Sequence, residues 1–336
     1  MLQLIATDLD GTILFDRKVS AADLGAMRRW RSAGNLLVVD TGKSVFATRD
    51  TLEPLGVVFD YAVTFTGAVL VDGDYRIVTS RFLPDGLARE IVMSLQGIDG
   101  LTVFATTLET DHIISDTYHE ISPILQVFVP MEPDQMTGHR FIGVPMRVRD
   151  DDTRERIVAD LTGRWGEQIE VVRTQEFLDV IPAGATKGAG LADLLARLTG
   201  SDGSRSGESI ETWSFGDSWN DISMHETADH AVAMNGSPPE VLAVCERTTT
   251  SAARRSTSAV RPAPLEEPAG TMSRKFWLWK PTATSPQRRA TSACMCAMSA
   301  GSAMRSGTPT TVRPARSARE ALENRVSRAV SEPIES

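Results

Sequence analysis

Short apolar runs alternate with helical segments along much of this chain, and few folds accommodate that pattern. Residues 2–7 form an apolar run of strand length, residues 20–34 carry apolar side chains at helical spacing, and residues 35–42 return to an apolar run. Strand, helix and strand in this order favour a parallel α/β sheet. Ligands usually bind at the carboxyl ends of such strands, so the residues that follow each run are the first candidates for a site.

The alternation breaks off in the middle of the chain, where helical patterns stand among strand-like runs with hairpin spacing. Such a mixture is typical of an α+β unit. The alternation resumes at about residue 186. We therefore expect an α/β core made of residues 1–82 and 183–248, interrupted by an α+β domain of residues 83–182.

The last part of the chain differs in composition. Residues 249–336 hold 14 lysines and arginines, six glutamates and no aspartate, a formal charge of +8, whereas the first 248 residues carry −17. The segment is rich in Ser, Thr, Ala, Arg and Pro and has no hydrophobic period, which is typical of a chain that cannot bury enough apolar surface to fold. We predict a disordered tail, produced by a reading-frame shift near residue 250 or present as a natural extension.

Composition also limits the partners of the part that folds. Its acidic charge argues against nucleic-acid binding, and no apolar stretch reaches the length of a membrane span. The chain starts without the basic and apolar regions of a signal peptide, and its three cysteines do not make a disulfide framework. We therefore expect a cytoplasmic protein with no nucleic-acid or membrane partner. The sequence does not determine its oligomeric state.

Carboxylates gather where apolar runs end. Asp8 and Asp10 follow the first run, and Asp217, Asn220 and Asp221 follow a later one. Like charges at the end of a buried strand cost stability unless a cation or a reaction uses them. Oxygen ligands of this kind suit Mg²⁺. The sequence therefore predicts a magnesium site at one edge of the sheet.

Two further polar clusters are suited to a phosphate group. Residues 41–44 follow the second apolar run, and Lys187 opens the later helical segment. The Thr41 hydroxyl and the Lys187 ammonium would balance the charge of phosphate oxygens. Taken singly, an aspartate pair at a strand end is more often a helix cap or a turn, and a lone lysine is more often a solvated helix start. Four clusters in order favour catalysis over these interpretations.

With these residues the sequence resembles the haloacid dehalogenase-like (HAD) phosphatase superfamily, specifically its Cof-type branch with a large α+β (C2-type) cap. The resemblance covers roughly residues 1–245 and rests on four motifs in order: residues 8–12, Thr41-Gly42, Lys187 and residues 216–221. It implies a Rossmann-like core, Mg²⁺ as cofactor, and hydrolysis of a small phosphorylated metabolite such as a sugar phosphate.

The resemblance also implies four catalytic roles. Asp8 would attack phosphorus and form an aspartyl-phosphate. Asp10 would protonate the leaving oxygen and then activate the water that hydrolyses the intermediate. Thr41 and Lys187 would hold the transferring phosphoryl group.

Two implied sets of residues complete the site. The metal ligands and the residues that support them are Asp8, Asp10 through its backbone carbonyl, Asp217, Asn220 and Asp221. The residues near the substrate entrance are Gly42, Lys43, Thr66 and Gly67. The chain departs from the family there, because Lys43 stands where an arginine is frequent and Thr66 stands where an asparagine is usual. These departures bear on the identity of the substrate more than on the chemistry.

Three alternatives stay open at this point. A phosphomutase or phosphotransferase on the same fold would pass the phosphoryl group to a hydroxyl instead of water. A non-catalytic phosphate-dependent switch, such as a response-regulator receiver, also combines strand-end acids with Thr and Lys, but the long cap and Asp10 argue against it. A damaged gene product that lacks its native C-terminus is the third.

Overall fold

The computed structural model describes residues 2–120, 127–174 and 176–249 of the chain. The predicted tail from residue 249 lies outside these residues except for its first position. An eight-stranded sheet, called the core sheet here, has the strand order β16-β15-β14-β1-β4-β5-β6-β7. Its first six strands in this order are parallel. They are β16 (Arg247–Thr249), β15 (His230–Met234), β14 (Ile210–Gly216), β1 (Leu2–Thr7), β4 (Leu36–Asp40) and β5 (Tyr61–Thr64).

Two antiparallel strands extend the core sheet beyond β5. β6 (Val69–Asp72) pairs with β5, and β7 (Ile77–Ser80) pairs with β6. Residues 73–76 connect them, which agrees with the hairpin that Asp72-Gly73 suggests. A small separate hairpin of β2 (Leu14–Phe15) and β3 (Lys18–Val19) follows β1.

Helices cover both faces of the core sheet because neighbouring residues of a buried strand point to opposite sides. Ile5 of β1 belongs to an apolar cluster with Met27 of α1 (Ala21–Ser32) and Leu52 of α2 (Val45–Leu52). Leu4 belongs to another cluster, with Leu191 of α5 (Lys187–Thr199) and α6 (Ile222–Thr227). The core is therefore a three-layer α/β arrangement, as the sequence predicts.

Local signals place the ends of these helices. The Ser20 side chain accepts a hydrogen bond from the backbone N–H of Asp23 and caps α1, and Ser44 and Thr186 cap α2 and α5 in the same way. The core part is completed by η1 (Phe65–Gly67), η3 (Trp219–Asp221) and α7 (Pro239–Ala243).

A six-stranded sheet, called the cap sheet here, is built from a middle stretch of the chain. Its order is β10-β9-β8-β11-β13-β12, with every pair antiparallel except β10 with β9. The strands are β8 (Leu101–Thr106), β9 (Asp111–Asp116), β10 (Val129–Pro130), β11 (Val144–Val148), β12 (Ile169–Arg173) and β13 (Phe177–Pro182).

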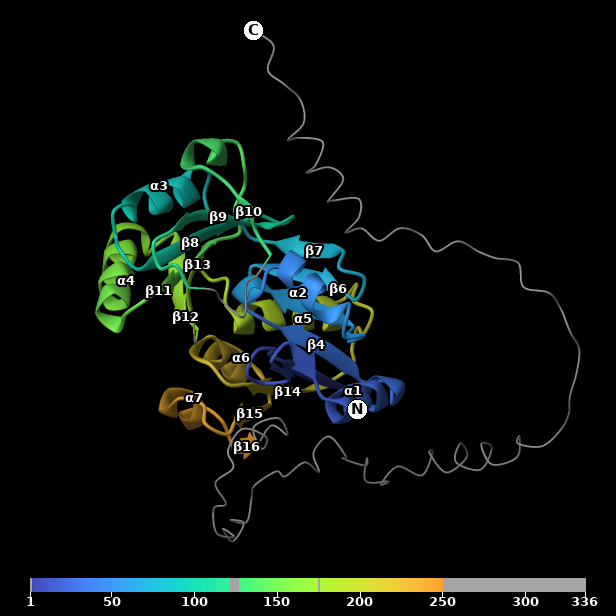
Figure 1. The fold of residues 1–336 in the computed structure, drawn as a ribbon. Coiled ribbons are helices and arrows are strands. Elements are labelled where there is room, and N and C mark those ends of the chain that lie inside the picture. The colour runs from blue at the N-terminus through green and yellow to red at the C-terminus, as the bar shows by residue number, and fades with distance from the viewer. Residues whose placement is uncertain (1, 121–126, 175, 250–336) are drawn as a thin grey trace, which may run out of the picture. The chain divides into compact units, whose positions relative to one another are not determined.

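Two helices pack on the cap sheet and give it a hydrophobic core of its own. Ile91 of α3 (Leu87–Ser94) and Leu161 of α4 (Asp151–Trp165) share one apolar cluster with Val103, Met146 and Val180 of the strands, and Figure 1 shows both helices beside these strands. η2 (Pro133–Met136) adds a short turn near α3. The segment is α+β, as its pattern predicts. Its boundaries as a domain, residues 83 and 182, stay a prediction.

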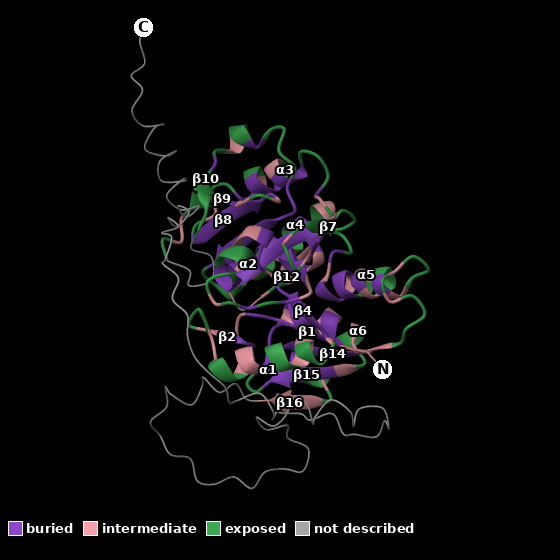
Figure 2. Cartoon of the chain, turned by 90° about the vertical axis from the view of Figure 1, so that its right-hand side faces the viewer, coloured by how far each residue is buried: buried purple, intermediate pink, exposed green. Residues whose placement is uncertain are grey.

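Burial follows this architecture. Figure 2 shows buried residues along the central strands of both sheets and exposed residues in loops and on the outer faces of helices. Within the described part of the chain, none of the helices combines the length and the apolar composition that crossing a bilayer requires.

Candidate functional site

The order of the central strands brings the predicted site residues to one edge of the core sheet. β1 lies between β14 and β4, and all three run parallel. Their last residues are therefore followed at the same edge by Asp8, Asp217 and Thr41. The Asp8 backbone N–H donates to the Phe215 carbonyl at 2.8 Å, which holds the first of these residues against β14.

Three carboxylates converge at this edge. One oxygen from each of Asp8, Asp217 and Asp221 lies within 4.8 Å of the others, and all three side chains are buried. Asp221 is held in place because one of its oxygens accepts from the backbone N–H groups of Asp217 and Ser218, each at 2.8 Å. The backbone hydrogen bonds of this turn therefore fix the Asp221 carboxylate relative to Asp217.

Lys187 lies among the acids and is fully buried. Its Nζ atom is 2.7 Å from Asp8 Oδ1 and 2.5 Å from Asp221 Oδ1. α5 begins at Lys187, and the Thr186 cap fixes that start. Burial alone would lower the pKa of Lys187, but the neighbouring carboxylates, Asp221 first, outweigh burial and raise it. The ammonium is therefore a permanent positive charge at this site.

One lysine does not neutralise the cluster. Burial is the main cause that raises the pKa of Asp8 to about 7, against the opposing attraction of Lys187. Burial and the like charges of Asp8 and Asp221 raise the pKa of Asp217 to about 8. These acids hold their protons more tightly than exposed ones, first because they are buried and second because like charges lie close to them. A bound cation would offset these like charges.

The loop after β1 lies close against one of these carboxylates. Gly11 has φ +84°, and a Cβ atom at this position would lie 2.2 Å from Asp217 Oδ2, so only glycine lets the loop approach that carboxylate. Thr12 Oγ1 lies 3.4 Å from Asp8 Oδ2 and 3.3 Å from Asp217 Oδ1. The hard oxygen donors, their spacing and their excess charge fit a small divalent ion such as Mg²⁺.

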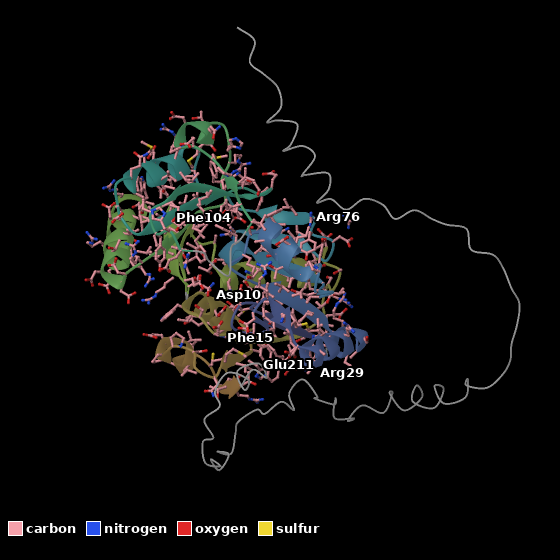
Figure 3. The ribbon with its side chains drawn as sticks, in the orientation of Figure 1. Asp10, Phe15, Arg29, Arg76, Phe104 and Glu211 are labelled. Atoms are coloured by element: carbon pink, nitrogen blue, oxygen red, sulfur yellow. The ribbon has the colours of Figure 1, made fainter. Side chains whose placement is uncertain are left out.

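Asp10 lies on the open side of the cluster. Its side chain is one-third exposed, and Oδ2 lies 3.0 Å from Lys43 Nζ. Asp10 is labelled in Figure 3, between the part of the chain that forms the core sheet and the part that forms the cap sheet. A carboxyl at such a place has access both to a bound substrate and to water.

A pocket opens over these residues, with about 710 Å³ of empty space that includes open solvent at its mouth. Elements of both sheets form its walls. The core side contributes Asp8, Asp10, Thr41, Gly42, Lys43, Ser44, Ala47, Phe65, Ser218 and Asn220, and the cap side contributes Asp111, Pro145, Thr174, Phe177 and Asp179.

Nine of the eleven predicted residues fall into two groups by position. Six of them line the pocket: Asp8, Asp10, Thr41, Gly42, Lys43 and Asn220. Lys187, Asp217 and Asp221 lie behind Asp8 and touch it or each other. Thr66 is buried beside the pocket, with Oγ1 3.4 Å from Asp179 Oδ2.

Gly67 is placed differently from the other residues of the predicted substrate entrance. A Cβ atom there would lie 2.0 Å from the Thr186 carbonyl oxygen, so this glycine lets η1 pack against the start of α5. It is not among the residues that line the pocket. The close approach to Thr186 explains why glycine is needed at this position. A side chain here would keep η1 from packing onto the backbone just before Lys187.

Three buried acids near the site are not among the residues that the sequence predicts. Asp111 and Asp179 line the pocket from the cap side, and Asp40, the last residue of β4, is fully buried with neither carboxylate oxygen hydrogen-bonded to any described residue. Burial raises the pKa of Asp40 well above its usual range. Both Asp40 and Asp179 are charged residues inside otherwise apolar strands, and that signal could have identified them.

Comparison with protein families gives a match over most of the chain. A family model described as haloacid dehalogenase-like hydrolase matches residues 5–258. Among individual relatives, the chain is 25% identical over 236 residues to YcsE, a 5-amino-6-(5-phospho-D-ribitylamino)uracil phosphatase of Bacillus subtilis; the match covers 69% of this chain and 84% of YcsE. It is 24% identical over 270 residues to YwtE, a phosphatase of the same description from that organism, covering 71% and 90%.

Solved structures agree on the fold. A haloacid dehalogenase-like hydrolase from B. subtilis superimposes with a TM-score of 0.62 at 21% identity and covers 74% of this chain and 95% of its own. The HAD subclass IIB sugar phosphatase BT4131 superimposes with a TM-score of 0.60 at 18% identity, covering 74% and 93%. The α/β core with an inserted α+β part is therefore a shared architecture.

Proposed function

The chain belongs to the haloacid dehalogenase-like hydrolases and is a phosphatase, a phosphoric monoester hydrolase, and we propose that it hydrolyses a small organic phosphomonoester with Mg²⁺ through an aspartyl-phosphate on Asp8. One observation carries this proposal. Asp8 lies at the floor of the pocket with one oxygen bound to the Lys187 ammonium, while Asp217 and Asp221 stand behind it. A nucleophile, a fixed cation and a set of metal ligands thus meet at one place.

Magnesium would be held by Asp8, Asp217 and the backbone carbonyl of Asp10, with Asn220 and Asp221 as supporting residues. When bound, Mg²⁺ neutralises phosphate oxygens and orients the phosphoryl group toward the nucleophile. The fit rests on the oxygen donors around Gly11 and on the three buried carboxylates of Asp8, Asp217 and Asp221, whose ligand atoms lie within 4.8 Å of one another.

In the first step, a carboxylate oxygen of Asp8 attacks phosphorus, and the bond from phosphorus to the substrate oxygen breaks. Asp10 gives its proton to that oxygen, which leaves as an alcohol. Lys187 keeps Asp8 oriented and supplies positive charge beside the reacting group. The Thr41 hydroxyl, which is buried at the pocket wall, would donate to a phosphoryl oxygen.

In the second step, Asp10 takes a proton from water, and the water oxygen attacks phosphorus. The bond from phosphorus to Asp8 breaks, which frees inorganic phosphate and restores the carboxylate. Lys43 is 3.0 Å from Asp10 and fixes the side chain that serves in both steps. Splitting one slow displacement into two, with a positioned acid and base, is the source of the rate gain.

The substrate is a small phosphorylated metabolite, because the pocket is bounded by the cap side as well as by the core side. YcsE and YwtE are described as phosphatases of a phosphorylated ribitylamino-uracil, and BT4131 as a sugar phosphatase, which supports a polyol-like or sugar-like substrate. A panel of phosphorylated metabolites tests the proposal. We expect phosphate release with Mg²⁺ and none with excess chelator. Release that is unaffected by the chelator, or no release from any compound, would contradict the proposal.

A further inference from the structure

The cap side of the pocket forms a wall that the proposed chemistry does not use. Asp8, Asp10 and Thr41 define where the phosphate is handled, and they all come from the core side. The opposite wall contains Asp111 and Asp179. A leaving group that extends from the phosphate toward the cap side would contact this wall.

The two acids of this wall differ in how fully their oxygens are occupied. Asp111 Oδ2 accepts from Ser44 Oγ at 2.6 Å, and Asp111 Oδ1 accepts from Thr106 Oγ1 at 2.8 Å. Both oxygens are thus engaged by protein hydroxyls, and one of these bonds ties β9 to the start of α2. Asp111 therefore has a structural role that accounts for its burial.

Hydrogen bonds of this kind do not explain the burial of Asp179. Its residue is 5% exposed, and the only side-chain hydrogen bond found for it within the described residues is the long one from Thr66, 3.4 Å to Oδ2. A carboxylate offers about four acceptor positions. Burying one with so few donors is costly, so the remaining acceptor positions of Asp179 are available to donors on a ligand in the pocket.

The surrounding backbone holds Asp179 rigidly at the pocket wall. It lies in the middle of β13, between β11 and β12, where it is paired with Pro145 on one side and Val172 on the other. On the core side, Phe65 and Thr66 have φ of 49° and 51°. Left-handed backbone is rare for a β-branched residue such as threonine, and here it accompanies the contact of the Thr66 hydroxyl with Asp179.

Charge at this wall disfavours an anionic leaving group. Asp111 and Asp179 are both acids, and Lys43, the lysine of the pocket lining, is already paired with Asp10 at 3.0 Å. A carboxylate on the leaving group would face other carboxylates in a partly enclosed site, where repulsion is less screened than in water. Hydroxyl groups would instead donate to Asp179.

We propose that Asp179 is a specificity-determining residue that accepts a hydrogen bond from a hydroxyl of the leaving group, and that the site thereby selects uncharged polyhydroxylated phosphomonoesters over those that carry a carboxylate. The proposal rests on the phosphatase function proposed above. Burial raises the pKa of Asp179 to about 7, and hydrogen bonds donated by a substrate would favour its ionised form.

Two pairs of compounds test this selection, since the members of each pair differ only in whether one carbon is CH₂OH or COO⁻. The pairs are glycerol 3-phosphate with 3-phosphoglycerate, and glucitol 6-phosphate with 6-phosphogluconate. The measured quantity is kcat/KM with Mg²⁺. We expect the wild type to prefer the alcohol by about tenfold or more in at least one pair, a typical effect of one charge-assisted hydrogen bond.

Asp179→Asn keeps the shape of the side chain and removes its charge. We expect kcat/KM to fall for the preferred alcohol, mainly through KM, and to rise for the matching acid, so that the preference drops by about tenfold. General damage to the protein would lower both values together. Asp134→Asn is the control: this carboxyl is exposed on the cap part and paired with Arg89, and its removal should leave the preference unchanged.

If Asp179→Asn does not fold, as its melting curve would show, Asp179→Ser removes the same charge with a smaller side chain and should lower the preference in the same way. A preference that is unchanged in the folded variant, or an equal loss for both members of the pair, would overturn the inference. Turnover of p-nitrophenyl phosphate by the wild type with none from either alcohol would overturn it as well. If the wild type also fails to turn over p-nitrophenyl phosphate, the proposed function itself is contradicted, and the inference with it.

Discussion

The Lys187 ammonium lies 2.7 Å from a carboxylate oxygen of Asp8, although 179 residues separate them in the sequence. The entire cap sheet is built from residues between them. The chain therefore leaves the core after β7, forms the cap sheet, and returns at α5 with a buried lysine directed at the proposed nucleophile. This ion pair joins the two parts of the core and also prepares the site for an anionic substrate.

Lys187→Met should abolish phosphatase activity and destabilise the fold. The variant leaves Asp8 and Asp221 buried without their partner, and breaking a buried pair in this way costs about 3 kcal/mol or more. Denaturant unfolding without metal measures the loss, and Mg²⁺ should restore part of it because a cation again offsets the acids. Lys18→Met, at an exposed lysine of β3, is the control and should be neutral. Equal effects of the two variants would contradict the role of Lys187.

Asp10→Asn should separate the two chemical steps. With a substrate whose leaving group needs no proton, such as p-nitrophenyl phosphate, the first step can proceed, while hydrolysis of the intermediate lacks its base. We expect a burst of p-nitrophenol close to one per enzyme followed by turnover slowed by about 10² or more. Rapid-mixing absorbance detects the burst. Steady turnover at the wild-type rate would remove Asp10 from the mechanism.

Gly11→Ala should weaken metal binding, because the added Cβ atom would lie 2.2 Å from Asp217 Oδ2. Gly34→Ala is a matched control, since Gly34 has φ +83°, nearly equal to the +84° of Gly11, but nothing within 4 Å of an added Cβ. Both variants pay the cost of left-handed backbone, about 1 kcal/mol. Only Gly11→Ala should raise the Mg²⁺ concentration needed for half-maximal activity, which a magnesium titration measures. A similar shift in both variants would mean that backbone strain, not the approach to Asp217, is responsible.

Much of the core and its site could be predicted because their signals are local. The Ser20 cap, the helical spacing that follows it and the polar residues after each apolar run each occupy a few consecutive positions. The rule that parallel strands end at one edge of a sheet then brings Asp8 and Asp217 together. The structure agrees with that expectation.

Residues whose role depends on distant contacts could not be predicted in the same way. Asp111 meets Ser44 across 67 positions, and Asp179 meets Thr66 across 113. Both contacts exist only once the cap sheet is placed against the core, and neither acid belongs to a motif. Asp40 ends an apolar run beside Thr41 and belongs to none of the four motifs, and only the structure shows that it is buried with no hydrogen-bond partner among the described residues.

Asp40 should make stability depend on pH. Burial raises its pKa well above 3.8, so the folded protein binds the proton more tightly than the unfolded chain. Its contribution to stability is therefore fully present below pH 3.8 and is lost as pH rises through the folded pKa. Asp40→Ala should gain stability relative to the wild type as pH rises, by about 1–3 kcal/mol in alkaline solution. Unfolding of metal-free protein across pH measures this, and a difference that stays constant with pH would contradict it.

The most direct test of the account is to trap the covalent intermediate. The enzyme is mixed with Mg²⁺ and a phosphomonoester that it turns over, quenched in acid within one turnover, and treated with borohydride, which reduces an aspartyl-phosphate to homoserine. Peptide mass spectrometry then locates the modified position. We predict homoserine at residue 8, its absence when chelator replaces Mg²⁺, and no phosphate release by Asp8→Asn. Modification at another residue, or wild-type phosphate release by Asp8→Asn, would contradict the central claim that Asp8 is the nucleophile.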